Sequence, residues 1–94
     1  MPKLKTSSFE EHRRIVRACI TANQERYGYN DEQLAKLLGI SLQTFRKKKQ
    51  TPDNFTLFEL QALSHTLKFT PIQAAGIILG RDITAKEVKD FILM

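Results

Sequence analysis

The chain has 94 residues, of which 41% are apolar and 27% charged, and its formal net charge at pH 7 is +5. This composition is typical of one soluble globular domain and argues against a disordered, collagen-like or membrane protein, since no apolar run approaches the ~20 residues that span a bilayer. The single cysteine, Cys19, cannot form an internal disulfide, and the N-terminus lacks the apolar stretch of a secretory signal. Both features favour a cytoplasmic protein.

The positive charge is concentrated in one tetrapeptide, Arg46-Lys47-Lys48-Lys49. Without it the chain carries eleven basic and ten acidic residues and is nearly neutral. A local cationic cluster attracts polyanions such as nucleic acid or anionic lipid, although a solvated helix face has the same composition. Charge alone leaves these two interpretations equal.

Capping signals recur along the chain and predict short helices, while strand and hairpin signals are weak. A cap side chain accepts a hydrogen bond from the start of its helix, and an apolar residue before the cap packs onto the fourth helical residue. This pattern occurs at five positions: Asn30, Ser41, Thr56, Thr70 and Thr84. With an earlier start near Ser7 or Ser8, the predicted helices cover residues 8–26, 31–38, 42–49, 57–67, 71–79 and 85–92. We therefore predict a compact all-α fold of five to six helices.

Glycine and proline mark the predicted helix ends. Gly28, Gly39 and Gly80 follow the first, second and fifth helices, and Pro52 stops the third. Apolar residues at helical spacing predict the buried faces: Leu34, Leu37, Leu38, Leu57, Leu60, Leu63, Leu67, Val88 and Ile92. We expect residues 1–6 to be loose, residues 7–70 to form the main domain, and residues 71–94 either to complete the core or to form a dimer interface.

The segment 30–50, NDEQLAKLLGISLQTFRKKKQ, predicts two short helices joined by a three-residue turn, 39–41. Gly39 permits a left-handed backbone at the end of the first helix, and Ser41 caps the second. Ala35 is small enough for close helix crossing, and Phe45 is the apolar residue of the second helix's inner side. This layout is that of a helix-turn-helix, whose second helix lies in the major groove of DNA.

A helical wheel identifies the outer face of the second helix. With Phe45 facing the core and a rotation of about 100° per residue, Gln43, Lys47 and Gln50 lie opposite it and Arg46 lies on the flank. Glutamine is suited to adenine, and lysine and arginine to guanine.

Residues 29–67 resemble the lambda-repressor-like, Xre/Cro family of helix-turn-helix domains. The matching residues are Gln33-Leu34-Ala35, Leu38-Gly39-Ile40-Ser41 and Thr44-Phe45, and the stretch 52–57 with Glu59-Leu60 is similar to small phage-type regulators. The resemblance implies sequence-specific binding of duplex DNA, usually as a homodimer, and transcriptional control. The family's base-reading positions correspond to Leu42, Gln43, Arg46 and Lys47. We expect phosphate contacts from Ser41, Thr44, Lys48, Lys49 and Gln50.

Two positions depart from the family pattern. Asp31 stands where relatives often carry a glutamine that helps to hold DNA; its charge would repel phosphate but suits a helix N-terminus. Lys48 and Lys49 turn partly inward on the wheel. Either their stems lie along the edge of the core, or the helix ends earlier than predicted.

Other polar residues give weaker signals. His12, His65 and Cys19 match no common zinc spacing, and no glycine-rich phosphate loop occurs. We therefore expect no enzymatic activity, metal, cofactor, small-molecule substrate or membrane partner. Arginines at 13, 14 and 17 fit a solvated face better than phosphate contacts. The alternative functions are a protein-interaction helix-turn-helix module (antitoxin or adaptor) and a phage packaging or structural subunit.

Overall fold

A computed structural model describes residues 8–81, 83–84 and 86, and over these residues it contains helices and no strand. The elements are α1 (Ser8–Tyr27), α2 (Asp31–Leu38), α3 (Leu42–Gln50), the 3-10 helix η1 (Pro52–Asn54), α4 (Leu57–Thr66) and α5 (Pro71–Leu79). The all-α prediction is confirmed, and the first five predicted helices agree with the structure to within one residue at each end. The predicted sixth helix, 85–92, lies outside the described residues except for Lys86, as do residues 1–6.

Local capping explains where the helices begin. Asn30 accepts a hydrogen bond from the backbone N–H of Gln33 at 2.8 Å, and the Gln33 side chain accepts one from the backbone N–H of Asn30 at 2.9 Å. The same reciprocal capping box opens α4 at Thr56 and α5 at Thr70. Each box satisfies backbone donors that the helix cannot pair internally, so the predicted caps of these helices are confirmed.

The core forms where α1, α2, α3, α4 and α5 meet. The side chains that are fully buried in it are Phe45, Ile20, Leu34, Leu63 and Leu67. The rings of Phe45 and Phe55 lie 6.1 Å apart in a tilted arrangement, which is favourable for aromatic pairs.

Two leucines that were predicted to be buried are exposed. Leu37 is 46% and Leu57 is 73% exposed. The buried face of α2 is completed by Ala35, so Leu37 lies to one side of it. Leu57 begins α4, at a turn where no described element covers it.

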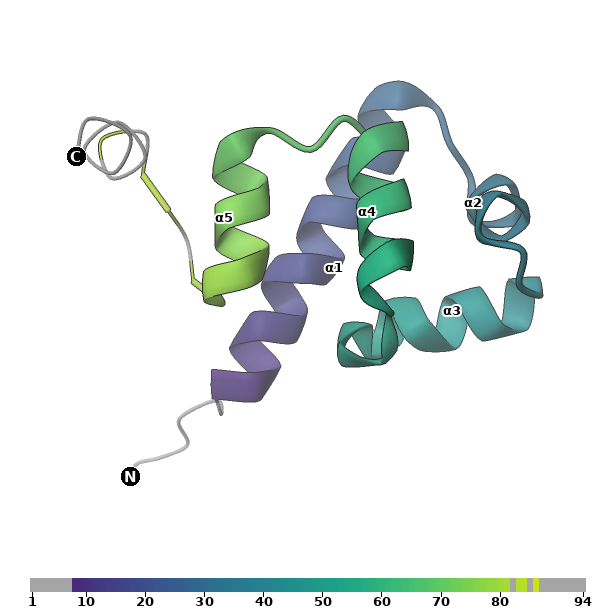
Figure 1. Cartoon of the computed structure of the whole chain (residues 1–94), viewed down its shortest axis with the longest axis horizontal. Helices are drawn as coiled ribbons and strands as arrows, with labels where there is room; N and C mark the ends of the chain where they lie inside the picture. Colours follow the sequence, from purple (N-terminus) through teal and green to yellow (C-terminus); the bar gives the residue numbers. More distant parts are fainter. Residues whose placement is uncertain (1–7, 82, 85, 87–94) are drawn as a thin grey trace.

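The helices have distinct positions (Figure 1). α1 runs diagonally from below α5 to behind α4, while α2 and α3 lie on the opposite side of α4 from α5. α2 is seen nearly along its axis and α3 lies across the view, so the chain changes direction sharply between them. No helix within the described residues combines the length and apolarity needed to cross a bilayer.

Candidate nucleic-acid interface

The turn between α2 and α3 fixes the direction of α3. Gly39 has φ of +70°, a left-handed conformation that strains residues with a Cβ. Its N–H donates to the carbonyl of Lys36 at 3.1 Å, and the N–H of Ile40 donates to the carbonyl of Ala35 at 3.0 Å. The Ser41 side chain then accepts from the backbone N–H of Thr44 at 3.0 Å and starts α3. The chain therefore turns sharply within three residues, with the N–H groups of Gly39 and Ile40 paired.

Phe45 anchors the inner side of α3. It is fully buried in the cluster that contains Leu34, Ala35 and Phe55. The prediction that Phe45 faces the core is confirmed, and it determines which side chains of α3 face outward.

The outer side of α3 carries the expected base-reading residues. Gln43, Lys47 and Gln50 are exposed, and 63% of the Arg46 side chain is accessible. Leu42 is half-buried and lines a surface hollow beside Arg46. Helix α3 thus presents amide, ammonium and guanidinium groups on one continuous surface, which we call the α3 polar face (Leu42, Gln43, Arg46, Lys47 and Gln50).

Ser41 and Thr44 lie exposed at the N-terminal end of this face. The Ser41 hydroxyl donates to Oγ1 of Thr44 at 2.8 Å. The Ser41 oxygen accepts from the backbone N–H of Thr44 in the first turn of α3, a region of positive potential that attracts phosphate. This geometry is compatible with their expected contacts to phosphate.

Lys48 and Lys49 lie differently from the expected phosphate contacts. Nζ of Lys48 is 2.8 Å from both carboxylate oxygens of Glu59. Nζ of Lys49 donates to Oε1 of Gln24 at 2.6 Å and approaches Oδ1 of Asp31 to 3.3 Å. Both lysine side chains are only 21% exposed. Of the two alternatives raised by the sequence, the structure shows inward-lying stems on a helix that continues to Gln50, so these two ammonium groups bind carboxylates within the molecule.

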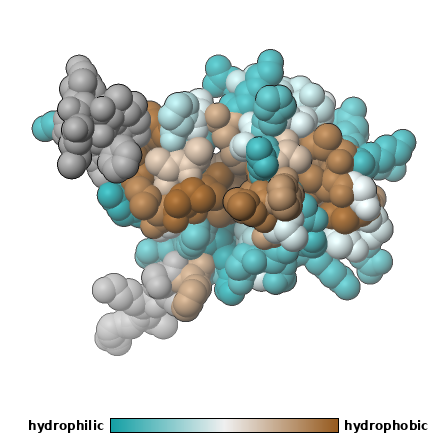
Figure 2. All heavy atoms as spheres, viewed as in Figure 1, coloured by the Kyte–Doolittle hydropathy of each residue, from teal (hydrophilic) through white to brown (hydrophobic). Residues whose placement is uncertain are grey.

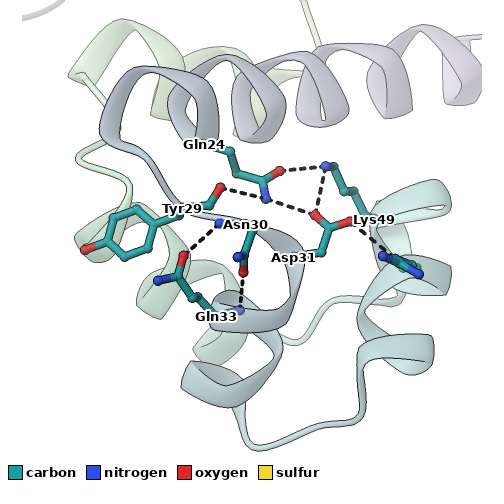
Figure 3. A network of polar contacts seen from close by, with 7 residues as sticks. Gln24, Tyr29, Asn30, Asp31, Gln33 and Lys49 are labelled. Atoms are coloured by element: carbon teal, nitrogen blue, oxygen red, sulfur yellow. Dashed lines mark hydrogen bonds and ion pairs between the residues drawn. The ribbon is translucent and has the colours of Figure 1, made fainter.

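Asp31 is the centre of a polar network that local sequence patterns did not reveal (Figure 3). Oδ1 of Asp31 accepts from Nε2 of Gln24 at 2.9 Å, and Oδ2 lies 3.5 Å from Nε of Arg46. Burial by itself would raise the pKa of Asp31, but the hydrogen bond from Gln24 and the charge of Lys49 outweigh it, so its pKa is lowered. Asp31 therefore joins α1, α2 and α3 as an ionised carboxylate.

Glu59 serves two elements at once. It completes the capping box of α4 with Thr56 and pairs with Lys48 of α3. Burial by itself would raise the pKa of Glu59. The hydrogen bond and charge of Lys48 and the hydrogen bond from the backbone of Thr56 outweigh burial, so the pKa of Glu59 is lowered. The C-terminal half of α3 is thereby attached to α4.

The arginines of α1 form ion pairs rather than a purely solvated face. Arg13 binds Asp53 of η1 through two hydrogen bonds of 3.1 and 3.2 Å. Arg17 donates to the backbone carbonyl of Gln50 at 2.6 Å and pairs with Glu10 at 2.7 Å. Arg17 thus satisfies a carbonyl at the C-terminal end of α3.

The residues considered as metal ligands are not assembled in the described part of the chain, where no three His, Cys, Asp or Glu side chains form a group able to hold a metal ion. Nε2 of His12 instead forms a hydrogen bond with the carbonyl of Ile77. Cys19 packs against the hydrophobic core.

A second surface of different character covers α4 and α5. Figure 2 shows apolar side chains spread across these two helices. We use the name α4–α5 apolar face for the exposed apolar side chains of these two helices, of which the most exposed are Leu57 (73%), Phe58 (80%), Ile78 (70%) and Leu79 (59%). Leu57 and Ile78 line the same hollow between the two helices.

Comparisons with protein-family models, with curated proteins and with solved structures found no match.

Proposed function

We propose that this chain binds duplex DNA sequence-specifically through the α3 polar face and acts as a small transcriptional regulator. The observation that carries the proposal is the two-sided construction of α3. Phe45 is fully buried on one side, while Gln43 and Lys47 are exposed on the other. A helix held in this way can enter a major groove without losing its packing.

The chemistry of the face suits base edges. The amide of Gln43 can donate to and accept from adenine, whereas Arg46 and Lys47 can donate to the acceptors of guanine. The half-buried Leu42 offers an apolar contact for a thymine methyl. Ser41, Thr44 and Gln50 flank these residues and supply phosphate contacts. Lys48 and Lys49 are left out of this set because their ion pairs would have to break first.

In this proposal α2, the turn and α3 form a helix-turn-helix of the lambda-repressor-like, Xre/Cro type. The capped turn at Gly39, the buried Ala35 and the crossing of α2 and α3 (Figure 1) support this assignment. The similarity of the sequence to phage-type regulators suggests a cytoplasmic regulator of that class.

The proposal includes a homodimer. A single short recognition helix offers few contacts, and a dimer places two half-sites about one helical turn, ~34 Å, apart on the DNA. The α4–α5 apolar face supports this step, because exposed apolar patches often mark protein contacts.

The test is selection of bound sites from random duplexes at low and at moderate salt. We expect a recurrent site, and Lys47→Ala should relax the preference at one base pair of that site, because Lys47 is proposed to donate to guanine. Lys68→Ala is the matched control, since it removes one exposed positive charge outside α3. Retention of no duplex above the random background, even at low salt, would contradict the proposal.

A second candidate function is a protein-interaction module of the antitoxin or adaptor kind. It is favoured by the exposure of Phe58 and Ile78 on the α4–α5 apolar face. In that case no duplex is selected at low salt, and Gln43→Ala leaves every interaction of the chain unchanged.

A further inference from the structure

Asp31 stands between the interior of the molecule and the α3 polar face. It is the first residue of α2, and its side chain is 25% exposed. Arg46, on the neighbouring helix, is 63% exposed. The ion pair thus joins the largely buried carboxylate of Asp31 to the exposed guanidinium of Arg46.

The carboxylate of Asp31 is fixed from the inside. Gln24 is 7% exposed and donates to Oδ1 of Asp31 at 2.9 Å. The same amide accepts from Nζ of Lys49 at 2.6 Å, and Lys49 also approaches Oδ1. Oδ1 is held by these partners (Figure 3), and Oδ2 lies 3.5 Å from Nε of Arg46.

We propose that Asp31 is a positioning residue that orients Arg46 for reading a guanine, an inference that rests on the proposed DNA-binding function. A guanidinium held at Nε still presents its two terminal nitrogens, the pair that matches O6 and N7 of guanine. A flexible arginine loses side-chain entropy when it binds, and the contact with Asp31 supplies part of that ordering beforehand. Asp31 thereby confers base preference although its own charge repels DNA.

Glu32 provides a matched control for simpler roles of Asp31. It is the next residue in the first turn of α2 and carries the same charge near the same helix N-terminus, but it is exposed. Glu32→Gln removes one negative charge close to α3, as Asp31→Asn does. An effect of overall charge or of the helix dipole should therefore occur in both Asp31→Asn and Glu32→Gln. A loss of the orientation of Arg46 should occur only in Asp31→Asn.

The experiment measures binding of the wild type and both variants to duplexes that differ from the selected site at single base pairs. Arg46→Ala first identifies the base pair whose preference depends on Arg46. At that pair Asp31→Asn should lose about two- to five-fold in preference, the range of an exposed ion pair, while Glu32→Gln should keep it. In the Arg46→Ala background, Asp31→Asn should cause no further loss of preference.

The inference is overturned if Asp31→Asn keeps the wild-type preference, changes all base pairs alike, or acts equally without Arg46. If that variant does not fold, Asp31→Glu replaces it, because it keeps the charge and moves the carboxylate by one methylene. A fall in preference at the Arg46-dependent pair then supports the inference, and an unchanged preference overturns it. A wild-type chain that selects no duplex overturns the proposed function as well, whereas selective wild-type binding with an unaltered Asp31→Asn preference overturns only the role of Asp31.

Discussion

The α3 polar face and the α4–α5 apolar face are built in opposite ways. α3 directs one apolar residue, Phe45, inward, and its polar side chains either face solvent or pair with carboxylates of neighbouring helices. α4 and α5, with the C-cap residue Leu67 of α4, supply Leu63, Leu67 and Ile77 to the core and expose further apolar side chains elsewhere. The large aromatic side chain of α3 is buried, whereas α4 and α5 keep apolar side chains that no other described residue covers.

The two surfaces are suited to different tasks: the α3 polar face to holding side chains in fixed directions, and the α4–α5 apolar face to association with another protein surface. Polar contacts from three elements hold the middle and the C-terminal end of α3. Asp31 of α2 pairs with Arg46 and Lys49. Glu59 of α4 pairs with Lys48, and Arg17 of α1 donates to the carbonyl of Gln50. A recognition surface needs such fixed geometry because hydrogen bonds to bases depend on direction. The apolar face needs only area and shape, because hydrophobic burial is not directional.

The largest expected effect comes from removing the anchor of α3. Phe45→Ala should lower the free energy of unfolding by about 3–5 kcal/mol, because the side chain is fully buried and leaves a cavity. Leu79→Ala on the apolar face is the control and should change it by less than about 1 kcal/mol, since Leu79 is 59% exposed. Denaturant titration of both variants measures the difference. A loss in Phe45→Ala as small as the one expected for Leu79→Ala would mean that the inner and outer sides of α3 are assigned wrongly.

The next effect concerns the outer side of the same helix. Gln43→Ala should weaken binding to the selected site by about 1–3 kcal/mol and binding to random duplexes much less, because only the base contact is lost. The preference should relax at one base pair per half-site, measured on a panel of single-base variants. An equal loss on all sequences would make Gln43 a phosphate contact, and no loss would favour the protein-interaction function.

Acid should loosen the attachment of α3. Asp31 and Glu59 have pKa values lowered from 3.8 and 4.5, so the stability that they contribute is complete above those values and is lost as pH falls through the lower folded-state pKa values. We expect a constant melting temperature near neutral pH and a decline below about pH 5. Glu59→Gln keeps the cap but loses the charge opposite Lys48, so it should cost about 1–2 kcal/mol at pH 7 and converge with the wild type in acid.

The control for this pH profile is Glu25→Gln, an exposed position on α1, which should follow the wild-type curve. A Glu59→Gln curve parallel to the wild type at every pH would show that the ion pair between α3 and α4 contributes no stability.

The sequence predicted the elements well because their signals are local. The capping box of Asn30 and Gln33 spans three residues, and the burial of Phe45 follows from helical periodicity. The network around Asp31 could not be predicted in this way, because Gln24 and Lys49 are 25 residues apart in the chain. The exposure of Leu57 was missed for a related reason: periodicity identifies an apolar face but not whether another element covers it.

The smallest effect on the isolated domain is expected on the apolar face, where it distinguishes association from stability. Phe58 is 80% exposed, so Phe58→Ser should change the free energy of unfolding by no more than about 0.5 kcal/mol. If this face forms the proposed homodimer, the same change should weaken self-association, measured by sedimentation over a concentration series. Binding to a duplex with two half-sites should fall, while binding to one half-site should not, because the α3 polar face is untouched. Leu37→Ser is the control, since Leu37 is exposed on α2 outside the apolar face. If Phe58→Ser and Leu37→Ser both sediment like the wild type, the α4–α5 apolar face is not the dimer interface. The α3 polar face then remains as the proposed contact surface.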